Sequence, residues 1–310
     1  MKSSINDNQI KICVGIVLYN PEIKLLQKNI ESIMMQSVDS IYLYDNASTN
    51  QNEIKCLLTR LQNDKKIVYE RGEKNLGISQ GLNKILYFAK SNEYDWFLTL
   101  DQDSICSENL IESYLKLINK EKIAIVCPVI LNNGKRTIED LKSMKLLDFE
   151  YIDDPVDCIT SASLNNTTII SKLGGYKQEL FIDCVDSELN CRIFLAGYKI
   201  IRSNKCFLIQ HMGDAKGIAF FSFLYKITKI DIFRRMQVAS VYSDKRLYYI
   251  SRNSAVVRKL HNNYGPKLRF SYIFALFCYF SVTYPITRSR FYIWKSFFDG
   301  YRDSYKFIKK

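Results

Sequence analysis

The sequence lacks the marks of several protein classes. Its nine Cys are scattered and no two form a CxxC pair. This pattern is typical of a reducing compartment rather than of a disulfide scaffold or a zinc ribbon. The first nine residues are polar and contain no apolar run, so we expect no signal peptide. Only two His are present.

The 310 residues suffice for one large domain or two modest ones. With 47% hydrophobic and 25% charged residues, the chain is not disordered. Its formal net charge of +12 leaves three kinds of partner open: nucleic acid, an anionic membrane and a phosphorylated substrate.

The positive charge is concentrated at one end of the chain. Residues 216–310 hold 19 Lys and Arg against 4 Asp and Glu, whereas residues 1–215 hold 25 against 28. The same C-terminal stretch carries 24 of the 41 aromatic residues. We therefore expect an α/β domain over residues 1–215 and a helical, basic and aromatic region over residues 216–310.

Short apolar runs alternate with amphipathic stretches in the first part. Helical spacing follows Pro21, and Asn20 is placed to cap that helix. The alternation predicts a mostly parallel sheet flanked by helices, with ligands at the carboxyl ends of the strands. The expected strands are 11–18, 41–44, 66–69, 96–100 and 123–129, and the later helices are 51–61, 78–89 and 110–118.

Polar residues follow the expected strands four times in succession. Each group alone could simply form a turn. Four in a row favour a ligand site. The groups are Tyr19-Asn20, Asp45-Asn46, residues 75–77 and residues 101–104.

The sharpest local signal is the acidic pair Asp101 and Asp103 after an apolar strand. Residues two apart share a face while the chain stays extended, so the carboxylates repel unless a cation lies between them. Hard oxygen ligands favour Mg²⁺ or Mn²⁺, which could neutralise a departing diphosphate. A solvated strand end is the alternative interpretation.

The motifs together resemble the family-2 inverting glycosyltransferases, which have a Rossmann-like GT-A fold. The form Leu-Thr-Leu-Asp-Gln-Asp-Ser at residues 98–104 resembles the rhamnosyltransferase-like branch. The resemblance covers residues 10–255. Its other pieces, in matching order, are residues 17–21, 44–48, 75–83, 174–198 and 246–253.

The resemblance implies a donor site for a nucleotide sugar. Tyr19 and Asn20 would border the base, and Asp45 would accept hydrogen bonds from its imide N–H. Gly77 would let the backbone approach the donor, because it lacks a Cβ. The remaining donor-binding residues implied are Asn75, Asn83, Asp101 and Gln102, with helix capping as the alternative role for the two Asn.

The resemblance also implies a metal site and a catalytic base. Asp101, Asp103 and His211 would hold Mg²⁺ or Mn²⁺, although a lone His at a strand end is often structural. Asp186 would take the proton of the acceptor hydroxyl, with Asp183 and Glu188 as rivals. The acceptor-side residues implied are Ser161, Asp183, Glu188 and Arg192.

An uncharged run of 18 residues, 270–287, lies between basic residues in the C-terminal region. It is barely long enough to span a bilayer, so we expect an interfacial helix, with a core helix as the main alternative. This expectation places the protein in the cytoplasm, peripheral on the inner face of the cell membrane.

The predicted activity is the transfer of a sugar, L-rhamnose from dTDP-rhamnose, to a lipid-linked saccharide in bacterial surface polysaccharide synthesis. UDP-galactofuranose, UDP-galactose and UDP-N-acetylglucosamine remain alternative donors. A sugar nucleotidyltransferase would need a Gly-rich basic loop that residues 19–22 lack. A non-enzymatic membrane-binding or nucleic-acid-binding protein is the more distant alternative; we expect no nucleic acid, because the basic residues flank apolar runs.

Overall fold

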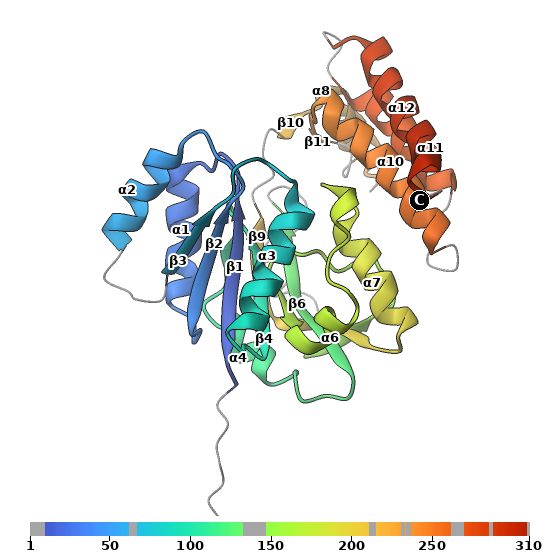
Figure 1. The fold of residues 1–310 in the computed structure, drawn as a ribbon. Coiled ribbons are helices and arrows are strands. Elements are labelled where there is room, and N and C mark those ends of the chain that lie inside the picture. The colour runs from blue at the N-terminus through green and yellow to red at the C-terminus, as the bar shows by residue number, and fades with distance from the viewer. Residues whose placement is uncertain are drawn as a thin grey trace, which may run out of the picture.

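The computed structural model describes residues 10–61, 67–132, 147–210, 215–230, 233, 237–261, 270–284 and 288–308. A nine-stranded sheet forms the centre of the molecule, and helices from the C-terminal region gather beside one end of it (Figure 1). The strand order is β3-β2-β1-β4-β8-β6-β9-β5, with β7 paired to β9. The predicted α/β architecture is therefore confirmed.

The elements of the first part agree closely with those expected from the sequence. They are β1 (Ile12–Leu18), α1 (Ile23–Met34), β2 (Ser40–Asp45), α2 (Gln51–Leu61), β3 (Ile67–Arg71), α3 (Ile78–Ser91), β4 (Trp96–Asp101), β5 (Ile105–Cys106), α4 (Leu110–Leu115) and β6 (Ile123–Asn132).

The later elements include several short strands without a clear signal in the sequence. They are β7 (Phe149–Ile152), β8 (Ser163–Asn166), α6 (Thr167–Lys172), η1 (Gln178–Leu180), α7 (Val185–Leu195), β9 (Lys199–Gln210), β10 (Ala215–Gly217), α8 (Ala219–Thr228), β11 (Val238–Ser240), α10 (Asp244–Leu260), α11 (Phe270–Thr283) and α12 (Arg290–Ile308).

The sheet is parallel in one half and mixed in the other. Strands β3, β2, β1 and β4 run parallel, as predicted. β8 lies between β4 and β6 and runs antiparallel to both. β5 and β7 also pair antiparallel with β9. The sequence predicted less antiparallel pairing, because strand order depends on contacts distant along the chain.

Both faces of the sheet are covered. Every residue of β1 is buried, as its continuous apolar run requires. Val14 and Ile16 face a cluster shared with α1, α2 and α4. Cys13 and Val17 face the opposite cluster, shared with α3 and α7. The alternation along one strand therefore builds two cores.

The start of α1 differs from the prediction. The helix begins at Ile23 with Glu22 as its N-cap, so Asn20 does not cap it. Asn20 instead has a left-handed backbone, with φ of 46°. Its Oδ1 accepts hydrogen bonds from the backbone N–H of Thr49 at 2.7 Å and from the Thr49 hydroxyl at 2.9 Å. The side chain therefore ties two strand-end loops together.

The C-terminal helices form a third core that is joined to the body. Leu247 of α10 packs in a cluster with Ile273 of α11 and Ile293 of α12. Val256, also on α10, belongs instead to the sheet-facing cluster. Among the described residues, no helix has both the length and the apolar character needed to cross a bilayer.

Candidate active site

One cavity of about 800 Å³ lies where the expected ligand site falls, beyond the carboxyl ends of β1 and β4. The start of α7 closes it on one side, and the first turns of α10 line another part. Eight of the residues to which the resemblance gave a role in binding or catalysis line this cavity. They are Tyr19, Asn75, Gly77, Asp101, Gln102, Asp103, Asp183 and Asp186.

The loop that carries Asp101 and Asp103 is held from α1. Asn29, which is fully buried, donates from Nδ2 to the carbonyl oxygens of Asp101 at 2.8 Å and Ser104 at 2.5 Å. The backbone N–H of Asp101 donates to Ser161 Oγ at 3.1 Å. These bonds fix the path of the chain directly after β4.

The electrostatics of this loop suit a divalent cation. Burial, and then the charge of Asp103, raise the pKa of Asp101 to about 6. Its Oδ2 accepts a hydrogen bond from Gln210 Nε2 at 3.4 Å. Two neighbouring carboxylates that repel each other form a donor set of hard oxygens, which fits Mg²⁺ or Mn²⁺. His211, the third predicted ligand, lies outside the described residues, among which no three potential ligands converge.

Asp186 faces the cavity from the first turn of α7. Its Oδ1 accepts a hydrogen bond from the backbone N–H of Ser187 at 2.8 Å. Burial raises the pKa of Asp186 to about 6, and the nearby charge of Asp183 acts in the same direction. A carboxyl with a raised pKa in a cavity is suited to accept a proton near neutral pH.

Asp183 forms an ion pair with Arg246 of α10, and both residues line the cavity. Arg246 Nη2 lies 3.1 Å from Asp183 Oδ1, and Arg246 Nε lies 3.3 Å from both carboxylate oxygens. Burial raises the pKa of Asp183, and Arg246 limits the rise. Lys245 also lines the cavity. The sequence patterns placed both cations in the C-terminal region and not in the site, although the matched stretch 246–253 was a signal for Arg246.

Gly77 is the point where the loop before α3 meets the loop before α7. Its φ is 86°, a left-handed conformation that favours glycine. A Cβ at this position would lie 2.4 Å from the carbonyl oxygen of Phe181. That oxygen accepts a hydrogen bond from the N–H of Ile78 at 2.7 Å. Because Gly77 has no side chain, the two loops can approach each other at the Phe181 carbonyl, and a ligand can also approach the backbone here.

Residues 13–184 match the model of Glycosyl transferase family 2, more than half of the chain. The chain belongs to this family. This glycosyltransferase is 25% identical over 262 residues to dTDP-rhamnosyl transferase RfbF of Shigella flexneri, covering 82% of this chain and 81% of the relative.

Solved glycosyltransferase structures share the fold of this family-2 glycosyltransferase. GalNAc-T7, solved with UDP, GalNAc and Mn²⁺, has a TM-score of 0.59 at 13% identity, over 98% of this chain and 57% of its own. Staphylococcus aureus TarS with UDP has a TM-score of 0.53 at 15% identity, over 96% and 91%. The mannosyltransferase PcManGT of Pyrobaculum calidifontis, with GDP-Man and Mn²⁺, has a TM-score of 0.56 at 13% identity, over 96% and 75%. The GT-A fold is thereby confirmed.

Several residues predicted for the glycosyltransferase site lie behind the cavity. Asp45 is fully buried and accepts from the backbone N–H of Ser48 at 2.8 Å and the hydroxyl of Tyr69 at 2.7 Å. Asn83 donates to the carbonyl of Tyr176 at 2.7 Å and accepts from its N–H at 2.8 Å, so its amide is used in holding two chain segments together. Asn20 and Ser161 are likewise bonded to neighbouring loops.

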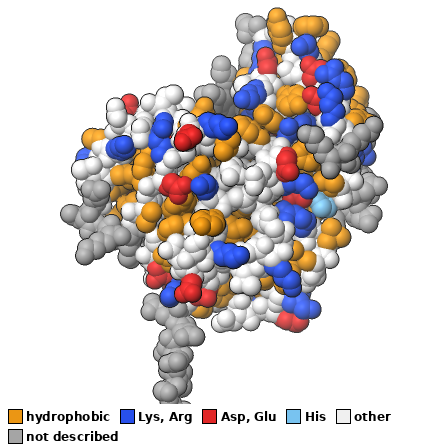
Figure 2. All heavy atoms as spheres, in the orientation of Figure 1, with side chains coloured by type: hydrophobic (Ala, Val, Ile, Leu, Met, Phe, Trp, Pro, Cys, Tyr) orange, Lys and Arg blue, Asp and Glu red, His pale blue; other side chains and the backbone are white. Residues whose placement is uncertain are grey.

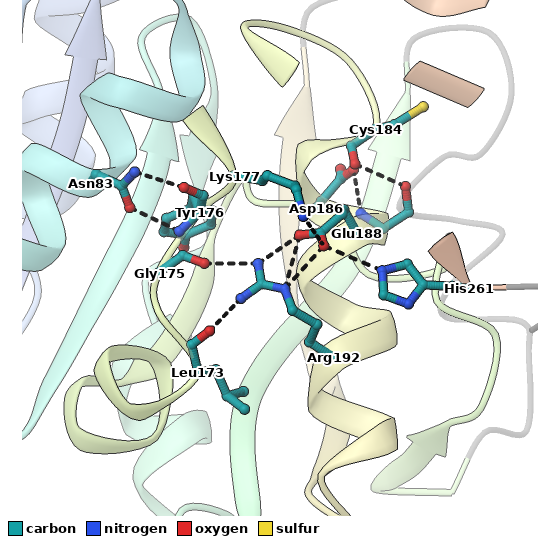
Figure 3. Close-up of polar contacts among 11 residues, drawn as sticks. Asn83, Leu173, Gly175, Tyr176, Lys177, Cys184, Asp186, Glu188, Arg192 and His261 are labelled. Carbon is teal, nitrogen blue, oxygen red and sulfur yellow. Dashed lines mark hydrogen bonds and ion pairs between the residues drawn. The ribbon is translucent and has the colours of Figure 1, made fainter. Parts of the chain in front are cut away.

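Glu188 and Arg192, one turn apart on α7, form an ion cluster that is not part of the cavity wall (Figure 3). Arg192 Nη2 lies 2.6 Å from Glu188 Oε2, and Arg192 Nε reaches both carboxylate oxygens. His261 Nε2 lies 3.3 Å from Glu188 Oε1. Burial alone would raise the pKa of Glu188, but His261 and Arg192 outweigh it and hold the pKa below its ordinary value.

The Arg192 side of this cluster anchors the chain before α7. Its Nη1 and Nη2 donate to the carbonyl oxygens of Leu173 at 2.6 Å and Gly175 at 2.8 Å. Lys177 Nζ lies 4.0 Å from Glu188 Oε1 (Figure 3). The buried carboxylate of Glu188 and its partners therefore hold α7 against the segment that leads to the cavity.

Proposed function

We propose that the glycosyltransferase moves a sugar from a nucleotide donor to an acceptor hydroxyl by a single inverting displacement. The acceptor oxygen forms a bond to the anomeric carbon as the bond to the nucleoside diphosphate breaks. Asp186 takes the proton of the hydroxyl. The observation that carries this proposal is that Asp101, Asp103 and Asp186 all line one cavity.

A divalent cation is part of the proposal. Asp101 and Asp103 would hold Mg²⁺ or Mn²⁺, with His211 as a further ligand. When bound, the ion would neutralise the charge that develops on the departing diphosphate. The Mn²⁺ in the GalNAc-T7 and PcManGT structures supports this part of the proposal.

On the donor side, Tyr19, Asn75 and Gln102 are the proposed contacts, since all three line the cavity. Gln102 is bonded to the backbone of Tyr19 through both amide atoms, at 2.8 and 3.2 Å, which joins the two loops. Asn75 Oδ1 accepts from Asn46 Nδ2 at 3.0 Å and from the N–H of Gly77 at 2.9 Å. Asp45, Asn20 and Asn83 would act by holding these loops in place.

The proposed donor is dTDP-L-rhamnose, which the likeness to RfbF supports. A UDP-sugar, namely UDP-galactofuranose, UDP-galactose or UDP-N-acetylglucosamine, is the second candidate. It is favoured by the UDP in the TarS and GalNAc-T7 structures. Both candidates need the same catalytic residues.

The proposed acceptor is a lipid-linked saccharide used in bacterial surface polysaccharide synthesis. Asp183 lines the cavity and is the proposed direct contact to its hydroxyl groups. Ser161, Glu188 and Arg192 would support the acceptor side from behind. Lys245 and Arg246 give this side of the cavity a positive charge that suits a phosphorylated acceptor.

A lipid-linked acceptor requires contact with a membrane. We assign this contact to the C-terminal helices, at the cytoplasmic face of the membrane. Phe274, Trp294 and Phe298 are 58%, 44% and 60% exposed around Phe277. Figure 2 shows hydrophobic side chains next to Lys and Arg on this part of the molecule. Aromatic side chains with flanking cations favour a lipid interface. The expected boundary at residue 215 then separates two kinds of surface rather than two separate functional units, because α10, which follows this boundary, also lines the cavity.

The membrane proposal has its own test. Replacing Phe274, Trp294 and Phe298 together by Ser should reduce co-sedimentation with liposomes of anionic lipid and leave release of nucleoside diphosphate from a soluble donor unchanged. Parent binding should also weaken with salt, because exposed charges are screened over about 10 Å at 0.1 M. Equal sedimentation of variant and parent would refute the proposed surface.

The reaction is tested most directly by a thermal-shift screen of dTDP- and UDP-sugars, each with and without Mn²⁺. A ligand that binds only the folded state raises stability by about 2.7 kcal/mol at 100 times its Kd. We expect one donor to raise the Tm, and more so with Mn²⁺. No shift with any of these donors would contradict the proposed function.

A further inference from the structure

The loop immediately before α7 has an unusual backbone. Phe181, Asp183 and Cys184 have φ of 64°, 63° and 60°. None of them is glycine, and a left-handed conformation costs about 1–2 kcal/mol for such a residue. A loop with three of them in four positions does not hold its shape by itself, so the surrounding structure must impose it.

A central restraint on this loop is one side chain of α10. Asn253 Nδ2 donates to three carbonyl oxygens, those of Leu180 at 2.8 Å, Ile182 at 2.6 Å and Asp183 at 3.0 Å. Asn253 is fully buried, and its Oδ1 accepts from Arg252 Nε at 2.9 Å. Three backbone acceptors that point inward thus converge on one amide group.

Other residues on the same side of α10 also contact this loop. Arg246 pairs with Asp183, and the ring of Tyr249 stacks on that of Phe181 with centroids 5.0 Å apart. Arg252 Nη2 donates to the carbonyl oxygens of Glu179 at 2.7 Å and Leu180 at 3.1 Å. Positions 246, 249 and 253 recur at helical spacing, so one stripe of α10 contacts the loop from end to end.

Asp186 depends on this loop. It follows Cys184 by two residues and belongs to the first turn of α7. The dihedral angles of the loop therefore set where the helix starts and where this carboxylate lies in the cavity. Asn253 itself is not among the described residues that line the cavity. Any effect that it has on the reaction must pass through the loop backbone.

We propose that Asn253 is a positioning residue for Asp186, which it serves by holding the backbone of residues 180–184 in its left-handed path. This inference rests on the proposed function, since it needs Asp186 to act as the base. Arg246 and Tyr249 contact side chains of the loop. Asn253 instead binds three of its backbone carbonyl groups and so ties the path of the chain to α10.

The test compares Asn253→Ala with the parent enzyme and with Asn166→Ala. Asn166 is the N-cap of α6, where its Oδ1 accepts from the N–H of Ile169 at 3.0 Å. It pairs with the start of β4, at the end remote from Asp101, and so controls for a general loss of stability. The assay is release of nucleoside diphosphate from dTDP-L-rhamnose, or from the UDP-sugar that best stabilises the protein, with water as the acceptor.

We expect Asn253→Ala to lower kcat about 100-fold, the size of effect that a small misplacement of a reacting group produces. The Kd for the donor should stay within about twofold of the parent value, because the donor residues come from other loops. The acid limb of the kcat profile should move to lower pH, as a released loop exposes Asp186 to water. Asn166→Ala should change the Tm but leave kcat, the Kd for the donor and the pH dependence of kcat unchanged.

Asn253→Ser keeps one donor in place of two and should lose about tenfold in kcat. If Asn253→Ala does not fold, Asn253→Ser is the variant that tests the inference. Turnover of folded Asn253 variants equal to that of Asn166→Ala would overturn the inference. Normal turnover by Asp186→Ala would instead overturn the proposed base, whatever Asn253 does, so the two failures are distinguishable.

Discussion

The two aspartate-bearing loops of the cavity are built in opposite ways. The loop of Asp101 and Asp103 continues a buried parallel strand and is held by Asn29 from α1. The loop of Asp183 leads into α7 through left-handed residues, and Asn253 from α10 holds it. The first loop takes its direction from the sheet, whereas the second takes it from a helix outside the sheet.

Under the proposed function, the two loops would have separate roles: donor and metal binding for the first, and acceptor binding and proton transfer for the second. A strand end in the middle of a sheet is rigid because its hydrogen bonds extend on both sides, and it suits the binding of a donor and a metal. A loop held by a separate helix can be shaped for each acceptor by changes in that helix. Placing both carboxylate sets in one cavity then lets the binding and the proton transfer be altered independently.

The largest expected effects separate the two loops directly. Asp103→Ala and Asp186→Ala should each lower kcat about 1,000-fold or more, within the range for loss of a catalytic group. Metal-dependent donor binding, measured by calorimetry with and without Mn²⁺, should fail in the first variant and persist in the second. Donor binding lost equally in both would remove the distinction between the loops.

Gly77→Ala should disturb the contact between the loop before α3 and the loop of Asp183. Its Cβ would meet the Phe181 carbonyl at 2.4 Å, and its φ of 86° disfavours any Cβ. We expect a loss of about 1–3 kcal/mol in the free energy of unfolding, with falls in both donor affinity and kcat. Denaturant titration and steady-state kinetics measure these quantities. Gly174→Ala is the matched control, since its φ is 85° but nothing lies within 4 Å of the added Cβ.

Asn29→Ala should affect the donor side alone. It leaves the carbonyls of Asp101 and Ser104 without their shared donor, which costs about 1–3 kcal/mol of stability. Donor KM should rise about tenfold, with the acid limb of kcat unmoved. This is the reverse of the pattern expected for Asn253→Ala. The same pattern in both variants would show that the loops are not independent.

The pH dependence of kcat should report Asp186. A base acts when deprotonated, and burial raises the pKa of Asp186 to about 6. Activity should therefore fall as the pH drops through about 6, by about tenfold for each further unit. Asp183 and Asp101 face the same cavity, so the profile of Asp183→Asn is the control. A parent profile flat from pH 7 to 5 would argue against Asp186 as the base.

The smallest expected effect concerns stability. Because the folded-state pKa of Asp186 is raised above its unfolded value of 3.8, its ionisation opposes folding increasingly as the pH rises from about 4 to 6. Asp186→Asn should stabilise the fold by about 1–3 kcal/mol at pH 7 and hardly at all at pH 4. Urea unfolding at the two pH values measures this. Equal effects at both would contradict the cause assigned.

Much of the body was predictable from local patterns. The apolar run of β1 and the alternation of strands and helices predicted the α/β sheet, because they reflect burial within each element. The polar residues after the strands predicted the place of the cavity, and the motif at residues 98–104 led to the family. The antiparallel β8 was not predictable in this way, since its sequence Ser-Leu-Asn-Asn contains no apolar run.

The roles of single residues depended on contacts distant along the chain. The resemblance implied an acceptor-side role for Glu188, but its carboxylate is enclosed by Arg192, Lys177 and His261. Arg246 lies 63 residues after Asp183, and Asn253 lies 70 to 73 residues after the loop residues that it binds. The sequence by itself determined the main elements up to residue 129, the family and the acidic motifs, because these arise from neighbouring residues. Only the tertiary structure decided which polar groups meet, because their hydrogen bonds join segments that no local periodicity relates.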